Sequence, residues 1–304
     1  MGGLLVRKVI AGLLLGLGSF LLVAALTVVV WGADAVKKTP LDTDSVTSLS
    51  GTADKLNPAT GEVESLQVKA ASVTQADAEL SDDDVVVFVN TSCLVIDEGD
   101  VPQCVDDSDD RLVSASSDVF ATDRHTAEAV NDEQYVPPSA GEKSGLINKW
   151  PFDAKKEDYS YWDGLLGEAV DAAYDGTETI DGLETYRYHV LIEEVPAVVI
   201  SDIDGIYSQD KYLWIDPTTG AIIKQTQHEV RALEDGSTLL DMELAFTDDQ
   251  VAANAADAKD NGRLLGMLTT TLPLVGFIGG AIALLAGLFL MLASRRQREP
   301  ATAE

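Results

Sequence analysis

The stretch Lys211–Gln227, KYLWIDPTTGAIIKQTQ, decides the fold because it encodes two strands and the turn between them. The aromatic and apolar residues on either side of the turn are typical of strands. Within the turn, the Asp216 side chain can bond to the backbone, Pro217 presets φ, and Gly220 tolerates a positive φ. The sequence therefore predicts a β-hairpin, and we expect the surrounding sheet to form the working surface of the protein.

The same turn signature recurs along the chain. Asn57–Val63, NPATGEV, matches the turn of this hairpin closely, and Asp123–Val130 is a weaker copy that lacks the Pro and the Gly. The spacing is not constant, so the copies do not form a solenoid period. A dense β-branched run at Asp84–Asp97 predicts a mostly buried strand, and the Asp181-Gly182 pair predicts another hairpin. The middle of the chain is therefore β-rich.

Helices are predicted at four places. Gly164–Tyr174 is expected to be a short helix, and Val251–Asn261 an Ala-rich one. Val9–Trp31 has no charged residue, and neither has Leu264–Ala293. Within the second stretch we expect Leu272–Ala293 to cross the membrane. About 20 apolar residues suffice to span a bilayer. The alternatives are a cleaved signal peptide for the first segment and a buried core helix for the second.

The positive-inside rule orients the two spans. Basic residues lie just outside each span: Arg7, Lys8, Arg295, Arg296 and Arg298. Both termini are therefore expected in the cytoplasm of a two-pass plasma-membrane protein. The expected order is a cytoplasmic N-terminus (1–8), a span (9–31), an extracytoplasmic domain (32–263), a span (272–293) and a cytoplasmic tail (294–304).

The formal net charge is −30, and the extracytoplasmic domain is more negative still because the five basic residues at the ends lie outside it. Such a field argues against nucleic acid as a partner and against flat docking on anionic headgroups. Solubility or adaptation to salt explains the charge without a ligand. The acidic clusters at 82–84 and 106–110 do not match the twelve-residue calcium loop, so no metal site is predicted.

The two cysteines, Cys93 and Cys104, both lie in the predicted outer region, where a disulfide is permitted. Gly99 and Pro102 between them suit a closed hairpin. A redox-active pair usually has the tighter CxxC spacing. The sequence therefore predicts a structural disulfide.

Aromatic residues are concentrated in one segment, Ile147–Trp162, INKWPFDAKKEDYSYW. Amphipathic rings are favoured at cavity mouths and at membrane interfaces. The alternative is a core or rim cluster that closes one end of a sheet. The candidate ligand-binding residues are Trp150, Phe152, Tyr159, Tyr161, Trp162 and, in the central hairpin, Trp214.

Catalytic motifs are absent from the sequence. The three histidines, His125, His189 and His228, have no zinc-site spacing. There is no nucleophile elbow, P-loop or dinucleotide fingerprint. We therefore expect a protein that is not an enzyme and has no cofactor. A hydrolase or transferase that uses paired carboxylates is left open, because nothing selects a pair among so many acids.

Two resemblances add to this interpretation. The segments GTETIDGLETYRYHV (176–190) and LWIDPTTGAIIKQ (213–225) resemble the sheet of LolA/LppX-like lipoprotein and lipid carriers, which bends an antiparallel sheet around an apolar cavity. Nearly the whole chain is similar to an actinobacterial membrane-protein family of unknown function labelled "PorA family". The marks of that family are LDTDSVTSLSGTA (41–53), WPFDAKKEDYSYWD (150–163), GTETIDGLETYRY (176–188), LWIDPTTGAIIK (213–224) and TTLPL (270–274).

The resemblances imply a twice-anchored envelope protein linked to lipoglycan maturation. The fold expected is mainly β (α+β), a curved antiparallel sheet or half-barrel flanked by two transmembrane helices. The label implies a porin, but a porin barrel needs alternating strands with apolar outer faces, whereas these strands lie in an acidic region. We therefore expect the domain to bind a membrane lipid or a lipid-linked glycan.

The alternative function is that of a non-enzymatic scaffold or regulatory partner of envelope biosynthesis proteins. A sizeable exposed apolar patch would favour it. Small residues of the second span, Gly276, Gly279, Gly280 and Ala281, suit packing against a helix of another protein or against the first span of the same chain.

Overall fold

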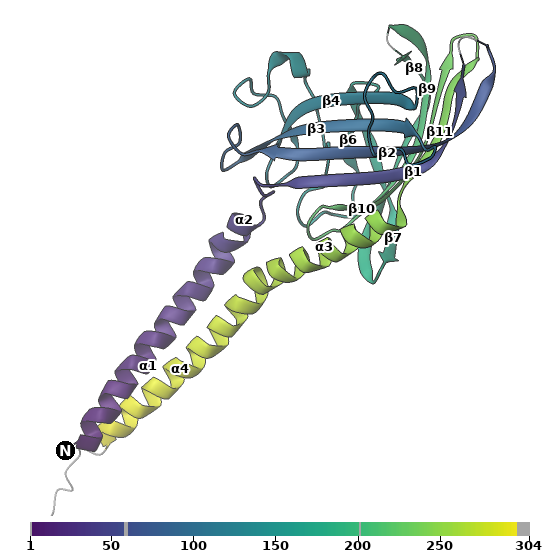
Figure 1. The fold of residues 1–304 in the computed structure, drawn as a ribbon. Helices are drawn as coiled ribbons and strands as arrows, with labels where there is room; N and C mark the ends of the chain where they lie inside the picture. Colours follow the sequence, from purple (N-terminus) through teal and green to yellow (C-terminus); the bar gives the residue numbers. More distant parts are fainter. Residues whose placement is uncertain (1, 58–59, 201, 297–304) are drawn as a thin grey trace, which may run out of the picture. The chain divides into compact units, whose positions relative to one another are not determined.

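Eleven strands form one antiparallel sheet in the computed structural model, which describes residues 2–57, 60–200 and 202–296 (Figure 1). The sheet curls, and it belongs to a unit of residues Lys38–Asp260. The expected fold class, a mainly β curved sheet or half-barrel with a helix at each end of the chain, is confirmed.

The strands follow a simple meander. The first five are β1 (Asp44–Leu56), β2 (Val63–Asp77), β3 (Val85–Ile96), β4 (Leu112–Asp123) and β5 (Ala129–Val130). The others are β6 (Tyr159–Asp163), β7 (Glu168–Ile180), β8 (Leu183–Ile200), β9 (Ile203–Ile215), β10 (Ile222–Leu233) and β11 (Thr238–Phe246). Their order is β5-β4-β3-β2-β1-β11-β10-β9-β8-β7-β6, so only the β1–β11 pair joins strands that are distant in the chain.

The recurring turn signature has one hydrogen-bond pattern in all three copies, which begin at Asn57, Asp123 and Asp216. The N–H of the first residue donates to the carbonyl five positions on, and the fifth N–H donates to the first carbonyl, over 2.8–2.9 Å. The fifth residue has a positive φ each time, 76° at Gly220. A related turn begins at Asp163: the Gly167 N–H donates to the Asp163 carbonyl over 2.9 Å, and Gly167 has a φ of 68°. This turn was not predicted from the sequence because it lacks the threonine.

One sequence prediction was wrong. Gly164–Tyr174 was expected to be a helix, but its second half is the start of β7. Ala172 pairs with Tyr159 of β6 and with Val190 of β8, and its side chain is fully buried. Tertiary pairing on both edges therefore overrides the helix propensity of the Ala-rich sequence.

The two edge strands of the sheet are joined by an extended segment, residues 145–154, which we call the strap. Ala129 of β5 donates its N–H to Gly145, and Leu146 exchanges backbone hydrogen bonds with Ser160 and Trp162 at β6, over 2.8–3.0 Å. The strap lies against the inner face of the sheet, defined here as the side that carries Tyr188 and Leu213.

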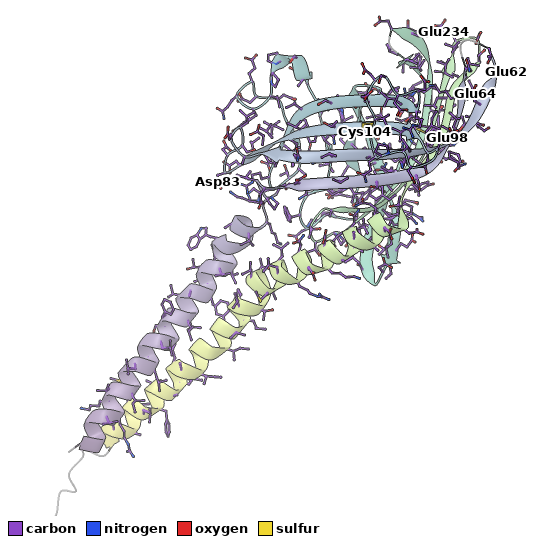
Figure 2. The ribbon with its side chains drawn as sticks, in the orientation of Figure 1. Glu62, Glu64, Asp83, Glu98, Cys104 and Glu234 are labelled. Atoms are coloured by element: carbon purple, nitrogen blue, oxygen red, sulfur yellow. A yellow bond between two sulfur atoms is a disulfide. The ribbon has the colours of Figure 1, made fainter. Side chains whose placement is uncertain are left out.

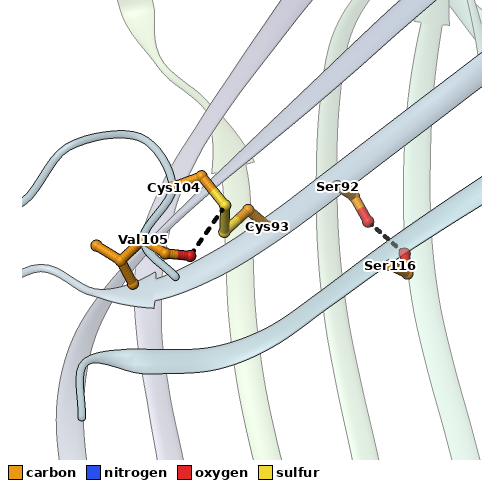
Figure 3. Close-up of a disulfide and its surroundings, with 5 residues drawn as sticks. All are labelled: Ser92, Cys93, Cys104, Val105 and Ser116. Atoms are coloured by element: carbon orange, nitrogen blue, oxygen red, sulfur yellow. Dashed lines mark hydrogen bonds between the residues drawn. A yellow bond between two sulfur atoms is a disulfide. The ribbon is translucent and has the colours of Figure 1, made fainter. Parts of the chain in front are cut away.

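The Cys93–Cys104 disulfide is confirmed, with a Cα–Cα distance of 5.5 Å. It ties the β3–β4 loop to the outer face of β3, whereas Ser92 and Ser116 bond across β3 and β4 (Figure 3). Val101 of this loop is 4% exposed and packs with Cys93. The loop therefore provides apolar cover for this part of the sheet. Figure 2 marks Cys104 among the side chains.

Replacing Cys104 with serine should lower the free energy of unfolding by about 2–3 kcal/mol, because the short loop is no longer closed in the unfolded chain. Urea unfolding with and without reducing agent checks this. The reductant should bring the wild type to the level of the variant and leave the variant unchanged. Equal midpoints without reductant would contradict the prediction.

The second unit comprises residues up to Lys37 and those from Asn261, and its described part is mostly helical. Its N-terminal part is α1 (Gly2–Thr27), continued by a π-helical turn (Val28–Gly32) and α2 (Ala33–Val36). The C-terminal helix begins in the other unit as α3 (Asp248–Gly266) and continues through a π-helical turn (Met267–Thr271) into α4 (Leu272–Arg296). A 3-10 turn, Pro138–Ala140, lies in the β5–β6 connection.

Both predicted spans lie in helices that are long and apolar enough to cross a membrane. The helices α1 and α4 run side by side (Figure 1). The orientation of the spans stays a prediction. Arg298 and most of the predicted tail (294–304) lie outside the described residues.

Glycines set the close approach of α1 and α4. A Cβ on Gly280 would lie 2.9 Å from the Gly18 carbonyl oxygen, and one on Gly276 would lie 2.9 Å from the Ala25 Cβ. Gly276 and Gly280 of the second span therefore pack against the first span of the same chain, whereas Ala281 is exposed.

Replacing Gly280 with valine should destabilise this helix pair by about 1–3 kcal/mol, since the branched side chain meets backbone that has no room to move. The matched control is Gly16→Val, because a Cβ at Gly16 meets nothing within 4 Å. The loss of helical circular dichroism on heating in detergent measures both variants. An equal response of the two variants would contradict this packing.

Candidate functional site

The inner face of β6–β9, beneath the strap, carries the largest collection of buried rings in the described residues. Cross-strand partners share a face of a sheet, so Tyr188 lies beside Leu213 on β9 and Tyr174 on β7. The buried members of this inner cluster are Ala127, Leu146, Trp150, Ala154, Tyr161, Ala172, Tyr188, Val190, Leu213 and Ile215.

Trp150 of the strap is at the centre of the cluster and is fully buried. Its ring centroid lies 5.4 Å from that of Tyr161, nearly parallel, and 5.1 Å from that of Tyr188. Tyr159 meets Trp150 edge-on at 6.4 Å. The hydroxyl of Tyr188 donates to the Lys155 carbonyl, and burial raises the pKa of Tyr188 far above its usual range.

The structure brings together three of the six residues predicted to bind a ligand, Trp150, Tyr159 and Tyr161. Phe152 and Trp162 are half-buried beside lysines: the Lys149 Nζ is 3.8 Å from the Phe152 ring centroid, and the Lys143 Nζ is 5.9 Å from that of Trp162.

Trp214 lies apart from them, on the outer face. Leu213, its neighbour, faces inward, and successive strand residues alternate between faces. The Trp214 indole donates to Glu178 over 2.7 Å, and Lys224 covers the ring at 4.3 Å. Ligand binding by any of the six residues stays a prediction.

Tyr188, Tyr174 and Leu213 were not predicted from the sequence to belong to this site. Their signal was the period of two in the strands around them, such as the tyrosines of TYRYHV at 185–190. The period assigns Tyr186 and Tyr188 to one face, but it does not reveal that Trp150 from a distant segment packs on that face.

Three consecutive strap residues bury polar groups with incomplete partners. Burial lowers the pKa of the Lys149 amino group to about 7. Its amine donates to Thr39 Oγ1 over 3.2 Å, and no carboxylate pairs with it among the described residues. Asn148 Oδ1 and Trp150 Nε1 are buried and find no hydrogen-bond partner there. Such groups are rare in folded proteins because burial without a partner costs free energy.

Replacing Lys149 with methionine should stabilise the protein near neutral pH. The folded pKa of about 7 lies below the ordinary 10.5, so the unfolded chain binds more protons between these values. Stability of the wild type should therefore rise with pH across that window, by up to about 1.4 kcal/mol per pH unit from this group.

Urea unfolding between pH 6 and 10 checks this prediction. The Lys149→Met variant should be more stable at pH 6, and its stability should rise less steeply with pH. Lys155→Met, at the exposed residue that directly follows the strap, is the matched control. A Lys149→Met profile that runs parallel to the wild type would contradict the prediction.

A second feature is a depression of about 300 Å³ on the outer face, where two extra residues bulge from β8 opposite Ser208. Glu194 in the bulge has a φ of 49°. The lining includes Leu191, Val230, His228 and three carboxylates, those of Glu193, Glu194 and Asp210. His228 bonds to Asp241 over 2.7 Å. Hydroxyl and ammonium groups suit this lining, and among the described residues no cluster suits a metal ion.

The buried acids of the inner face are used within the protein. Asp163 accepts a hydrogen bond from the Tyr207 hydroxyl over 3.1 Å, and Glu229 pairs with Arg231 over 2.5 Å. Burial and these two carboxylates raise the pKa of Tyr207 far above its usual range. The four groups form two partnered pairs, and buried polar groups need such partners.

Comparison with known proteins gives one family. The model of a family described as Porin PorA matches residues 10–289 of the chain. No curated protein matches the chain.

Proposed function

The chain belongs to the Porin PorA family, and from this premise we propose a membrane-anchored envelope protein whose β-rich domain binds a lipid or a lipid-linked glycan. Family membership and the two long apolar helices support a membrane-associated β-rich protein. The expected two-pass topology, with both termini cytoplasmic at the plasma membrane, is part of the proposal, as is a supporting role in lipoglycan biosynthesis.

The observation that supports ligand binding is the kind of segment that covers the inner cluster. A curled sheet presents Tyr161, Tyr188 and Leu213 on its inner face, and a single extended segment covers them where a helix or a second sheet would cover a permanent core. Apolar and aromatic surfaces of this kind bind hydrocarbon and sugar rings. The proposal involves neither catalysis nor a cofactor, and the acidic surface disfavours nucleic acid as a partner.

The family description raises a different function, conduction through a barrel. A membrane-spanning barrel presents apolar side chains outward. Here the outer face of β8–β10 carries Arg187, Asp210 and His228, and the inner face is filled by the Trp150 cluster. These placements favour binding over conduction.

Native mass spectrometry of the full chain, released from nanodiscs made of its host lipids, tests the proposal. We expect a discrete lipid or glycolipid adduct at one copy per chain, identified in organic extracts. The acidic depression offers a matched variant pair: if sugar is bound there, Asp210→Asn should weaken the adduct and Asp204→Asn should not. An adduct-free protein that also takes up no added lipid would overturn the proposal.

The alternative function, a scaffold for envelope biosynthesis proteins, is favoured by the β8–β9 hairpin tip. Val198, Ile200 and Ile203 are each about half exposed there, and exposed apolar groups of this kind mark protein contacts. Co-purification of a stable partner that is lost in Ile200→Ser, but retained in Val46→Ser at another exposed apolar position, would favour this function over lipid binding.

A further inference from the structure

We infer that the strap occupies a binding site for a hydrocarbon chain: when residues 148–154 move away, the inner face of β6–β9 receives the acyl chain of a lipid in their place. This inference rests on the proposed function, because it names the site at which the lipid binds. In the closed position the Trp150 indole occupies the place of the ligand, because it fills the space between Tyr161 and Tyr188.

Few backbone hydrogen bonds hold the strap in its closed position. Past Leu146, its backbone is held to the β9–β10 turn by Trp150 N–H to Gly220 O and Ala154 N–H to Pro217 O, each 2.8 Å, with a longer Asp153 contact of 3.4 Å to Thr218 O. The strands beneath it pair along their length: β8 and β9 are in register from Tyr186 to Ile192. Segments with few backbone hydrogen bonds open at lower free energy than the sheet.

The closed position also leaves polar groups poorly satisfied. Lys149 has a buried amine with no carboxylate partner in the described chain, and Asn148 Oδ1 and Trp150 Nε1 have no hydrogen-bond partner there. All three regain water when the strap leaves the inner face. The closed and open positions are therefore closer in free energy than the number of buried rings implies.

The surface beneath Trp150 defines the ligand class. Ala172, Val190, Leu213 and Ile215 are at most 1% exposed and present only carbon atoms of their side chains to the cluster. The rings of Tyr161 and Tyr188 flank them. A flexible apolar chain matches this lining, whereas a charged headgroup would lose its hydration without a partner.

Two measurements on the full chain in nanodiscs test the inference. A lysophosphatidylcholine with a diazirine in its acyl chain is photocrosslinked and its attachment mapped by mass spectrometry. Hydrogen exchange is then followed with and without unlabelled lysophosphatidylcholine, comparing peptides of the strap with peptides of β9. We expect crosslinks on Tyr161, Tyr188 or Leu213, and strap exchange about tenfold faster with the lipid while β9 is unchanged.

A variant pair makes the test specific to the strap. Lys149→Met removes a group that favours opening, so it should lower the crosslink yield severalfold while the domain stays folded. Lys155→Met, at the exposed residue that directly follows the strap, should leave the yield unchanged.

The outcomes separate the two proposals. Lipid that binds but crosslinks only outside the inner face, with unchanged strap exchange, overturns the strap inference and leaves lipid binding intact. A chain that takes up no lipid at all overturns the proposed function and the site together.

Discussion

Replacing Gly220 with alanine should lower the free energy of unfolding by about 3–5 kcal/mol, among the largest effects of a single added methyl group. Two causes act together. The φ of 76° is unfavourable for a residue with a side chain, by about 1–2 kcal/mol. In addition, the new Cβ would lie 1.9 Å from the Trp150 carbonyl oxygen and 2.8 Å from that of Pro151, so the strap would have to move.

The control for this prediction measures only the free-energy cost of the positive φ, without a steric clash. Gly236 has a φ of 86°, but a Cβ there meets nothing within 4 Å. Gly236→Ala should therefore show only the conformational part, about 1–2 kcal/mol. Urea unfolding of both variants in detergent, followed by near-UV circular dichroism, makes the comparison. Equal losses would mean that the strap does not press on the turn.

Replacing Trp150 with alanine should lower the free energy of unfolding by about 3–5 kcal/mol, because the fully buried ring leaves a cavity among Tyr159, Tyr161 and Tyr188. The same change on the half-buried Trp162 is the matched control and should have a clearly smaller effect. The measurement is again urea unfolding. A Trp150→Ala variant as stable as Trp162→Ala would show that the indole is not part of a packed core.

The two changes should not be additive. Gly220→Ala displaces the strap backbone at Trp150, and Trp150→Ala removes the ring that the same backbone positions. Residues that share one contact usually show a coupling energy, so we expect the double variant to lose less stability than the two single losses together.

Several features of the fold could be predicted because their causes are local. Asp216, Pro217 and Gly220 form the expected turn through their own φ preferences and the Asp216 side chain, which accepts from Thr219 over 3.0 Å. The disulfide followed from two cysteines in a short outer loop, and the spans from uninterrupted apolar runs. The candidate site was predicted in part: Trp150, Tyr159 and Tyr161 do gather, as their density in one segment indicated.

Other features depended on contacts between distant residues. Ala169–Tyr174 is a strand because β6 and β8 flank it, although its composition favours a helix. Trp214 and Trp150 were grouped by residue type, yet one lies on the outer face and the other beneath the strap. No local pattern distinguishes an extended loop on the surface from an extended loop against the inner face.

By itself, then, the sequence determined the β-rich domain, its turns, its disulfide and its two apolar helices. The tertiary structure alone decided which strands pair across the chain, that residues 145–154 join the sheet edges, and which rings share a cluster. The physical reason is the distance along the chain over which each interaction acts. Turn and strand preferences act between near neighbours, whereas the burial of Trp150 and of the Lys149 amine arises only when segments far apart in the chain meet.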